Sequence, residues 1–380
     1  ELIGFCSAWG YWLCAVIANV SYLVIVFSAL SFFTDTPELR LFGDGNTWQS
    51  IVGASALLWI VHFLILRGVQ TAASINLVAT LAKLLPLGLF VVLAMMMFKL
   101  DTFKLDVTGL ALGLPVWEQV KNTMLITLWV FIGVEGAVVV SARARNKRDV
   151  GKATLLAVLS ALGVYLLVTL LSLGVVARPE LAEIRNPSMA GLMVEMMGPW
   201  GEIIIAAGLI VSVCGAYLSW TIMAAEVPFL AATHKAFPRI FARQNAQAAP
   251  SASLWLTNIC VQICLVLIWL TGSDYNTLLT IASEMILVPY FLVGAFLLKI
   301  ATRPLHKAVG VGACIYGLWL LYASGPMHLL LSVVLYAPGL LVFLYARKTH
   351  THDNVLNRQE MVLIGMLLIA SVPATWMLVG

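Results

Sequence analysis

Eleven apolar runs, each long enough for a helix to cross a bilayer, occupy most of this sequence. Only 11% of its 380 residues are charged, against about 25% in an average soluble domain. Runs this long exclude an outer-membrane barrel, whose strands cross with about ten alternating residues. The sequence therefore predicts an all-α polytopic membrane protein without a soluble domain between spans. The runs fall near residues 8–33, 49–67, 71–98, 121–142, 153–177, 201–226, 253–271, 276–299, 307–324, 327–346 and 360–379.

The connecting loops alternate in charge along the chain. One set carries fifteen Lys and Arg residues, and the other carries six together with eleven Asp and Glu residues. Basic loops stay in the cytoplasm, so the first set is expected there. The net charge of +4 thus reflects membrane topology, and we expect no nucleic-acid partner. The first set comprises Arg67, Arg143, Arg145, Lys147, Arg148, Lys152, Lys235, Arg239, Arg243, Lys299, Arg303, Lys307, Arg347, Lys348 and Arg358.

The fourth run places a carboxylate, Glu135, at membrane depth between Gly133 and Gly136. A glutamate in hydrocarbon costs roughly 2.5–3.5 kcal/mol on insertion scales, so it should face a cavity or a partner. Each glycine weakens a helix by about 1 kcal/mol and lets the backbone open. An opened helix is tolerated at this depth only where it lines a protein-buried or watery site. The pattern predicts a transporter's binding site, with Glu135 either neutral or charged against a cationic substrate.

Five other residues at membrane depth are candidates for the same site. Lys83 lies near the middle of the third run, too deep for easy snorkelling, and can act as a fixed cation or a proton carrier. Glu284 either lines the cavity or pairs with another helix. Asn19 is either glue between helices or a ligand group. Trp129 and Trp220 are too deep for an interfacial belt, and an indole there can stack on a cationic substrate.

Features of an enzyme or a pump are not visible in the sequence. Of the six histidines, only His62 lies well inside a span, and no carboxylate or cysteine accompanies it at helical spacing. No phosphate-binding loop of the Gly-x-x-x-x-Gly-Lys-Ser/Thr type occurs. We therefore expect a non-enzyme that uses neither a metal nor a cofactor.

Three segments resemble the amino acid–polyamine–organocation superfamily. The stretch LWVFIGVEGA at 128–137, followed by ARARNKRDVG at 142–151, is similar to the sixth helix of that superfamily and its cytoplasmic exit. The segment AFPRIFAR at 236–243, through Pro250, resembles the loop after the eighth helix. Tyr11-Trp12-Leu13 with Asn19 resembles the third helix. Within the superfamily, the chain is most similar to basic amino acid antiporters of the arginine/ornithine type.

The resemblance implies a single transporter domain over 1–380 with the LeuT-like fold of two inverted five-helix repeats. Residues 1–98 would be the remainder of the first repeat, 121–299 the second repeat, and 307–380 three additional C-terminal helices. The family's first two helices, one of which carries a glycine-rich substrate-binding break, are expected to lie outside this sequence. On this expectation, the 380 residues alone should not transport.

The resemblance also implies roles for particular residues. Trp129 would stack on the aliphatic stem of the substrate, while Ile132 and Gly133 would offer backbone carbonyls to its ammonium. Asn19 would hydrogen-bond the distal cationic group, and Glu135 would couple the site to the cytoplasmic gate. Trp220 would lie along the outer or the inner path, and Lys83 would replace the cation of sodium-coupled relatives.

The predicted function is exchange of basic amino acids across a bacterial cytoplasmic membrane, with arginine entering and ornithine leaving. Lysine/cadaverine or another amino acid–polyamine exchange and proton-coupled amino acid symport remain alternatives within the same class. A non-transporting amino acid sensor is the alternative from another class. The expected partners are basic amino acid substrates and membrane lipid. A homodimer stays open, because lipid-facing and subunit-facing apolar surfaces look alike in sequence.

Overall fold

A computed structural model describes residues 2–106, 108–109, 112–136, 147–350 and 356–379. The described residues form helices and connecting turns, and they contain no β-strand. In chain order the helices are α1 (Leu2–Thr34), α2 (Trp48–Leu66), α3 (Val69–Met97), α4 (Leu100–Lys104), α5 (Val116–Trp129), α7 (Lys147–Val175), α8 (Arg178–Glu183), α9 (Ser188–Met197), α10 (Pro199–Thr233), the 3₁₀ helix η3 (Arg239–Ala242), α11 (Ser251–Thr271), α12 (Tyr275–Ile300), α13 (Pro304–Ser324), α14 (Pro326–His350) and α15 (Arg358–Val379).

Seven helices within the described residues are long and apolar enough to cross a membrane. They are α1, α2, α10, α11, α12, α13 and the Asp149–Val175 part of α7. Three further helices, α3, α14 and α15, contain 29, 25 and 22 residues. The fourth predicted run, 121–142, does not form one continuous helix. Helix α5 covers only its first part and ends at Trp129. These helices confirm the prediction, made from the apolar runs, of a multi-pass membrane protein.

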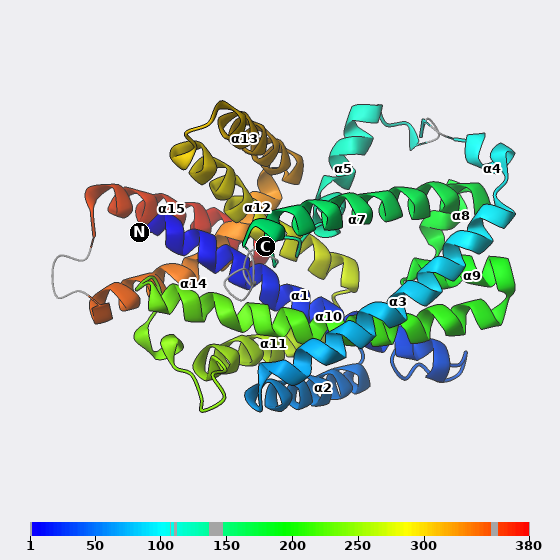
Figure 1. Ribbon diagram of the computed structural model, residues 1–380, viewed down its shortest axis with the longest axis horizontal. Coiled ribbons are helices and arrows are strands. Elements are labelled where there is room, and N and C mark those ends of the chain that lie inside the picture. The colour runs from blue at the N-terminus through cyan, green and yellow to red at the C-terminus, as the bar shows by residue number, and fades with distance from the viewer. Residues whose placement is uncertain (1, 107, 110–111, 137–146, 351–355, 380) are drawn as a thin grey trace.

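The two kinds of loop gather at opposite ends of the molecule. The α1–α2 connection, α4, α8 and α9 lie at one end, while η3 and the junction side of α14 and α15 lie at the other (Figure 1). The first group includes the acidic loops and the second the basic ones. By the positive-inside rule we refer to these as the outer end and the cytoplasmic end.

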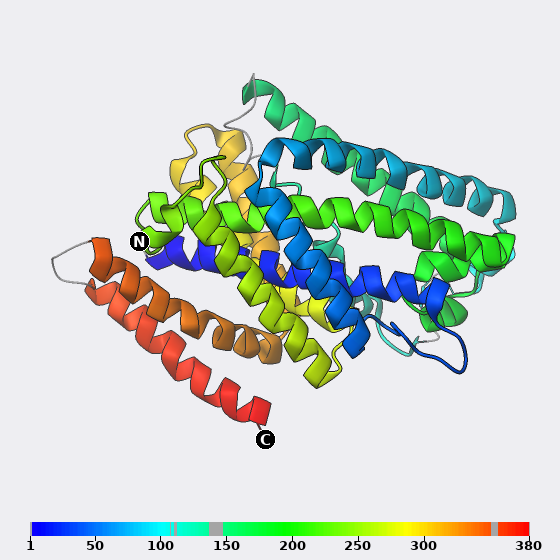
Figure 2. The same ribbon diagram turned by 90° about the horizontal axis from the view of Figure 1, so that it is seen from below.

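Helix α1 is the centre of the fold. Figures 1 and 2 show it running through the middle of the bundle, and it packs against α10, α12, α11 and α2. Its sequence is apolar on every face, which is the pattern of a helix surrounded by protein. Small residues permit close approach, since a Cβ at Gly10 would overlap the Tyr336 hydroxyl of α14 and approach the Met285 carbonyl of α12.

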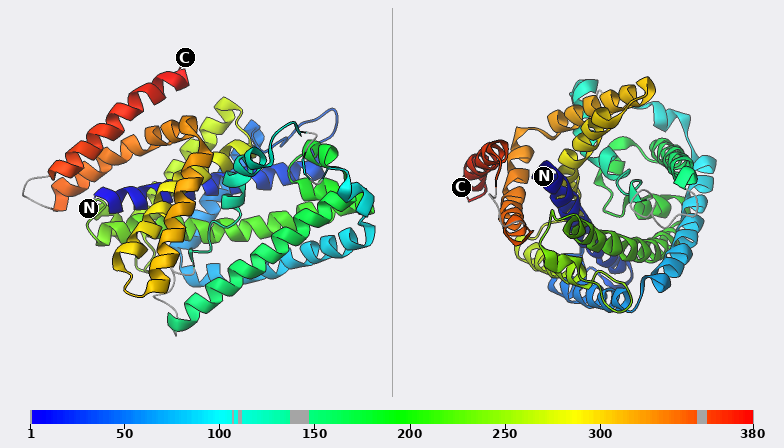
Figure 3. Two further views of the ribbon diagram at one scale, coloured as in Figure 1. Left: turned by 90° about the horizontal axis from the view of Figure 1, so that it is seen from above. Right: turned by 60° about the vertical axis from the view of Figure 1, so that its left-hand side comes forward.

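Helices α14 and α15 form an antiparallel pair on one side, away from α3 and α7 (Figure 3). The short helices α8 and α9 connect α7 to α10 at the outer end and were not predicted from the apolar runs. Helix α9 packs on α10, where Ala190, Leu192 and Met193 become buried. The connection between α7 and α10 is thus a folded hairpin that covers part of the outer end.

Hydrogen bonds and an ion pair hold the α1–α2 loop in place at the outer end. Asp35 accepts hydrogen bonds from the backbone amides of Leu41, Phe42 and Gly43 at 3.2, 3.0 and 2.8 Å. Arg185, between α8 and α9, pairs with Asp44 of this loop at 2.9 Å and donates to Ser31 of α1 at 3.0 Å. The α8–α9 hairpin is therefore fastened to the outer end of α1.

Candidate functional site

The helix opens where the two glycines predicted it would. Helix α5 ends at Trp129, and residues 130–135 follow as successive turns. Gly133 has φ +109°, a conformation that L side chains rarely adopt. The amide of Gly136 bonds to the carbonyl of Gly133, three residues back, instead of the carbonyl of Ile132, four residues back. The Ile132 carbonyl therefore loses its helical partner, which makes it a candidate ligand for a cation.

Glu135 closes a hydrogen-bonded cluster below the break. Its carboxylate accepts from the hydroxyl of Tyr11 on α1 at 3.1 Å and from the hydroxyl of Tyr290 on α12 at 3.0 Å. The backbone amide of Gly133 donates to the same carboxylate at 3.0 Å. Three donors on one carboxylate offset the cost of placing it inside the protein. The side chain of Glu135 thus joins the broken helix to α1 and α12.

An aromatic cluster lies on the other side of the break. Tyr22 of α1 lies between Trp129 and Trp220, with ring centroids 6.5 and 6.4 Å away. The indole of Trp220, on α10, packs directly on Gly133, since a Cβ there would lie 3.1 Å from Cζ2. Ile132 also packs against this cluster. The structure therefore brings together Trp129, Ile132, Gly133 and Trp220.

Asn19 occupies the face of α1 that looks toward this cluster. Ala15 and Tyr22, four residues before it and three after it, both belong to the cluster, and residues at this spacing share a helix face. The Asn19 side chain is 0% exposed, and neither its amide nitrogen nor its amide oxygen has a hydrogen-bond partner among the residues that the structure describes. A buried amide without partners costs about 1–3 kcal/mol, so a ligand that satisfies it would be bound favourably.

The groups are arranged in order along the membrane direction. Helix α1 runs from the cytoplasmic end outward, so Tyr11 lies on the cytoplasmic side of Asn19 and Tyr22 on its outer side. Eight residues separate Tyr11 from Asn19, which is about 12 Å along the helix axis. The Glu135 cluster thus lies on the cytoplasmic side of the Asn19 amide. The tryptophan cluster lies level with that amide and on its outer side.

Lys83 and Glu284 are placed differently from this group. The Lys83 side chain is exposed, as are those of Leu84 and Leu85, whereas Phe90, two turns further along α3, is buried. Its expected position inside the protein is therefore not found. Glu284 is buried on α12, six residues before Tyr290, so the two side chains point about 120° apart. A role for either residue in gating stays a prediction.

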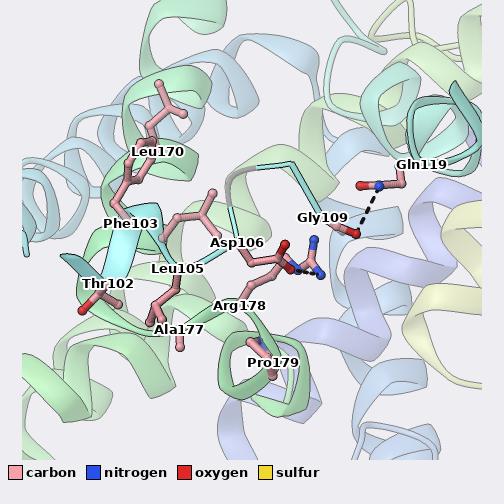
Figure 4. A pocket seen from close by; sticks show the side chains of 11 residues that line it. Thr102, Phe103, Leu105, Asp106, Gly109, Gln119, Leu170, Ala177, Arg178 and Pro179 are labelled. Carbon is pink, nitrogen blue, oxygen red and sulfur yellow. Dashed lines mark hydrogen bonds and ion pairs between the residues drawn. The ribbon is translucent and has the colours of Figure 1, made fainter. Parts of the chain in front are cut away.

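A separate cavity of about 400 Å³ opens at the outer end between α4, α5, α7 and α8 (Figure 4). Arg178 and Asp106 form an ion pair at 2.5 Å inside it. Gln119 donates to the carbonyls of Thr108, Gly109 and Leu114 beside this pair. The cavity is thus held by its own polar contacts and is distinct from the cluster around Glu135.

Sequence reasoning missed the tyrosines that complete the site. Tyr11 entered it only through a resemblance, and Tyr22, Tyr165 and Tyr290 were not singled out. Tyr11 and Tyr290 are 124 and 155 residues from Glu135 along the chain, so no local spacing could have paired them. The available signal was weaker: Tyr11 and Asn19 lie within about a quarter turn of each other on one helix.

A membrane-embedded site built on an interrupted helix, with a half-buried carboxylate on its cytoplasmic side, is typical of secondary transporters. Comparison with known proteins agrees. The family model described as Amino acid permease matches residues 1–368. The chain therefore belongs to the amino acid permease family, as its motifs predicted.

Three relatives illustrate the similarity. The arginine/ornithine antiporter of Pseudomonas aeruginosa is 44% identical over 367 residues, which cover 91% of this chain and 75% of the relative. The arginine/agmatine antiporter of Chlamydia pneumoniae is 39% identical over 392 residues, or 97% of this chain and 80% of the relative. The arginine/agmatine antiporter of Chlamydia caviae is 40% identical over 370 residues, which cover 93% of this chain and 75% of the relative. These relatives are transporters, which agrees with the expected absence of an enzymatic role at this coarse level.

Proposed function

We propose that this protein exchanges basic amino acids across the cytoplasmic membrane of a bacterium, taking up arginine and releasing ornithine by alternating access. The observation that carries the proposal is the buried amide of Asn19, which has no hydrogen-bond partner in the described part of the chain. It shares a helix face with residues of the tryptophan cluster beside an opened helix. A long cationic substrate supplies what this site lacks, namely hydrogen-bond donors for the amide oxygen. The antiporter relatives support the same substrate class.

The substrate contacts follow from the positions of the groups. Trp129 offers an aromatic face to the aliphatic stem and the cationic head, an interaction worth roughly 0.5–2 kcal/mol. The carbonyls of Ile132 and Gly133 would accept hydrogen bonds from the substrate's ammonium where the helix has opened. The Gly133 carbonyl, which accepts from the Gly136 amide, would use its second lone pair. Asn19 takes the distal guanidinium or ammonium, and Trp220 covers the substrate from α10. Each group binds positive charge or apolar surface, so the site favours basic amino acids.

The Glu135 cluster acts as the cytoplasmic gate. The hydrogen bonds of Glu135 to Tyr11 and Tyr290 connect the segment that follows α5 to α1 and to α12. They do so on the cytoplasmic side of Asn19. Protonation of the carboxylate would remove acceptor capacity that the three donors use. The gate therefore loosens when Glu135 gains a proton, and this couples opening to the proton. Glu284 and Lys83 are further proposed coupling residues on α12 and α3.

The inverted-repeat architecture is part of the same proposal. In this architecture α1, α2 and α3 of the first repeat are equivalent to α10, α11 and α12 of the second. Helix α1 packs on α10 and α2 packs on α11, while α3 packs on α10 as α12 packs on α1. This exchange of partners is what a two-fold relation in the membrane plane would produce, and it supports the assignment.

Two relatives are arginine/agmatine antiporters, which favours agmatine as the second candidate for the exported substrate. Agmatine lacks the α-carboxylate, whereas ornithine retains it. Asn19 lies where the shared cationic end would bind, so it serves either substrate. Competition by ornithine and by agmatine against bound arginine decides between the two.

Calorimetric titration of the purified full-length protein with arginine tests the proposal. A hydrogen bond to a charged group contributes about 1.5–3 kcal/mol, so Asn19→Ala should weaken arginine binding about 10- to 150-fold. Asn357→Ala, which changes an exposed asparagine at the cytoplasmic end, is the matched control and should bind like the wild type. Equal affinity for arginine in both variants would remove Asn19 from the site.

A further inference from the structure

Tyr165 of α7 contacts the broken helix from outside the substrate site. Its hydroxyl donates a hydrogen bond of 2.9 Å to the backbone carbonyl of Val130, the first residue after α5. Its ring also meets the ring of Phe131 edge-on, with centroids 5.5 Å apart and planes at 77°. A single side chain of α7 thus holds both the backbone and a side chain at the start of the break.

The bond to Val130 replaces one that a continuous helix would make. In an unbroken helix the Val130 carbonyl would accept from the amide of Val134. Here the Val134 amide bonds to Phe131 at 3.4 Å, and the Ile132 amide bonds to Trp129 at 3.1 Å. A carbonyl freed at membrane depth must find another donor, because no bulk water is present to supply one. The Tyr165 hydroxyl is that donor.

The other end of the break is held in a complementary way. The carboxylate of Glu135 accepts from the freed amide of Gly133 at 3.0 Å. A donor from α7 therefore fixes the first turn, and an acceptor within the segment fixes the last. Between these two points lie Ile132 and Gly133, whose carbonyls are the ones proposed to bind the substrate's ammonium.

We propose that Tyr165 is a positioning residue for the substrate site, and that its hydroxyl keeps the broken helix open by holding the Val130 carbonyl. The expected effect of Tyr165 on arginine binding rests on the proposed function. Its expected effect on the backbone of residues 131–136 does not. Motion of α7 would move Val130 with it, so the hydroxyl also transmits displacement of α7 to the residues that bind substrate.

The variant Tyr165→Phe removes the hydroxyl and keeps the ring against Phe131. Tyr165 is 39% exposed, so the change creates no cavity in a packed core. Tyr345→Phe, on the 60% exposed Tyr345 of α14, is the control for loss of a tyrosine hydroxyl. In Tyr165→Phe we expect arginine to bind about two- to twelvefold more weakly, the range set by one neutral hydrogen bond. The control should bind like the wild type.

Hydrogen–deuterium exchange of the backbone amides of residues 131–136 gives a readout that needs no substrate. We expect these amides to exchange faster in Tyr165→Phe than in the wild type or the control, with peptides of α10 and α11 unchanged. Exchange that is identical in all three proteins would overturn the assignment. If wild-type protein binds no arginine while this local difference is present, the proposed function fails and the role of Tyr165 stands.

Discussion

Replacing Gly133 with alanine should weaken arginine binding about 5- to 150-fold while leaving the protein folded. The residue has φ +109°, and a side chain forced into such a backbone region costs about 1–3 kcal/mol. The free energy converts to that range of affinity if only the opened helix binds substrate. In addition, the new Cβ would lie 3.1 Å from Cζ2 of Trp220, so the indole would have to shift by a few tenths of an ångström.

Gly312→Ala is the matched control, because Gly312 lies on α13 with open space around its Cβ position. A helical glycine changed to alanine should gain about 0.5–1 kcal/mol of stability, since the unfolded chain loses flexibility. Arginine affinity by calorimetry and thermal stability in detergent are measured for both variants. If Gly133→Ala binds arginine as tightly as Gly312→Ala does, the opened backbone is not the binding form.

Three further predictions concern charge. Glu135→Gln should flatten the pH dependence of exchange while leaving arginine affinity broadly intact, because the amide no longer gains or loses a proton; an unchanged pH profile would exclude Glu135 from coupling. Lys83→Ala should slow turnover, and wild-type exchange should be indifferent to sodium, so a strict sodium requirement would contradict the fixed-cation role. Partial burial raises the pKa of Asp35, but the amides of Phe42 and Gly43 prevail and hold that pKa below its ordinary value of 3.8. Its stabilising contribution is therefore complete above that value and is lost as pH falls through the lower folded-state pKa. Thermal melting should show this loss in the wild type but not in Asp35→Asn.

The broken helix was predictable because its causes are local. Glycines on both sides of a carboxylate within an apolar run are visible in ten residues, and the structure opens at that place. Helix positions were predictable for a similar reason, since spanning length and apolar composition are properties of a single segment. The amide of Asn19 stood out because polar groups are rare in such surroundings.

The partners of these groups were not predictable, because they come from distant parts of the chain. Tyr290 and Tyr165 lie in apolar helices whose composition gives no reason to select one tyrosine over another. The α8–α9 hairpin was missed because its helices have 6 and 10 residues, too short to register as spans. Depth within a run is limited in the same way: it places Lys83 midway along α3 but does not reveal on which face of that helix the side chain is exposed.

Counterflow in proteoliposomes tests the central claim most directly. Vesicles containing the purified full-length protein are loaded with ornithine, labelled arginine is added outside, and empty vesicles are run in parallel. The proposed antiport predicts uptake of arginine into the loaded vesicles and none into the empty ones. Equal uptake into empty vesicles under a proton gradient would contradict it and would make the protein a symporter.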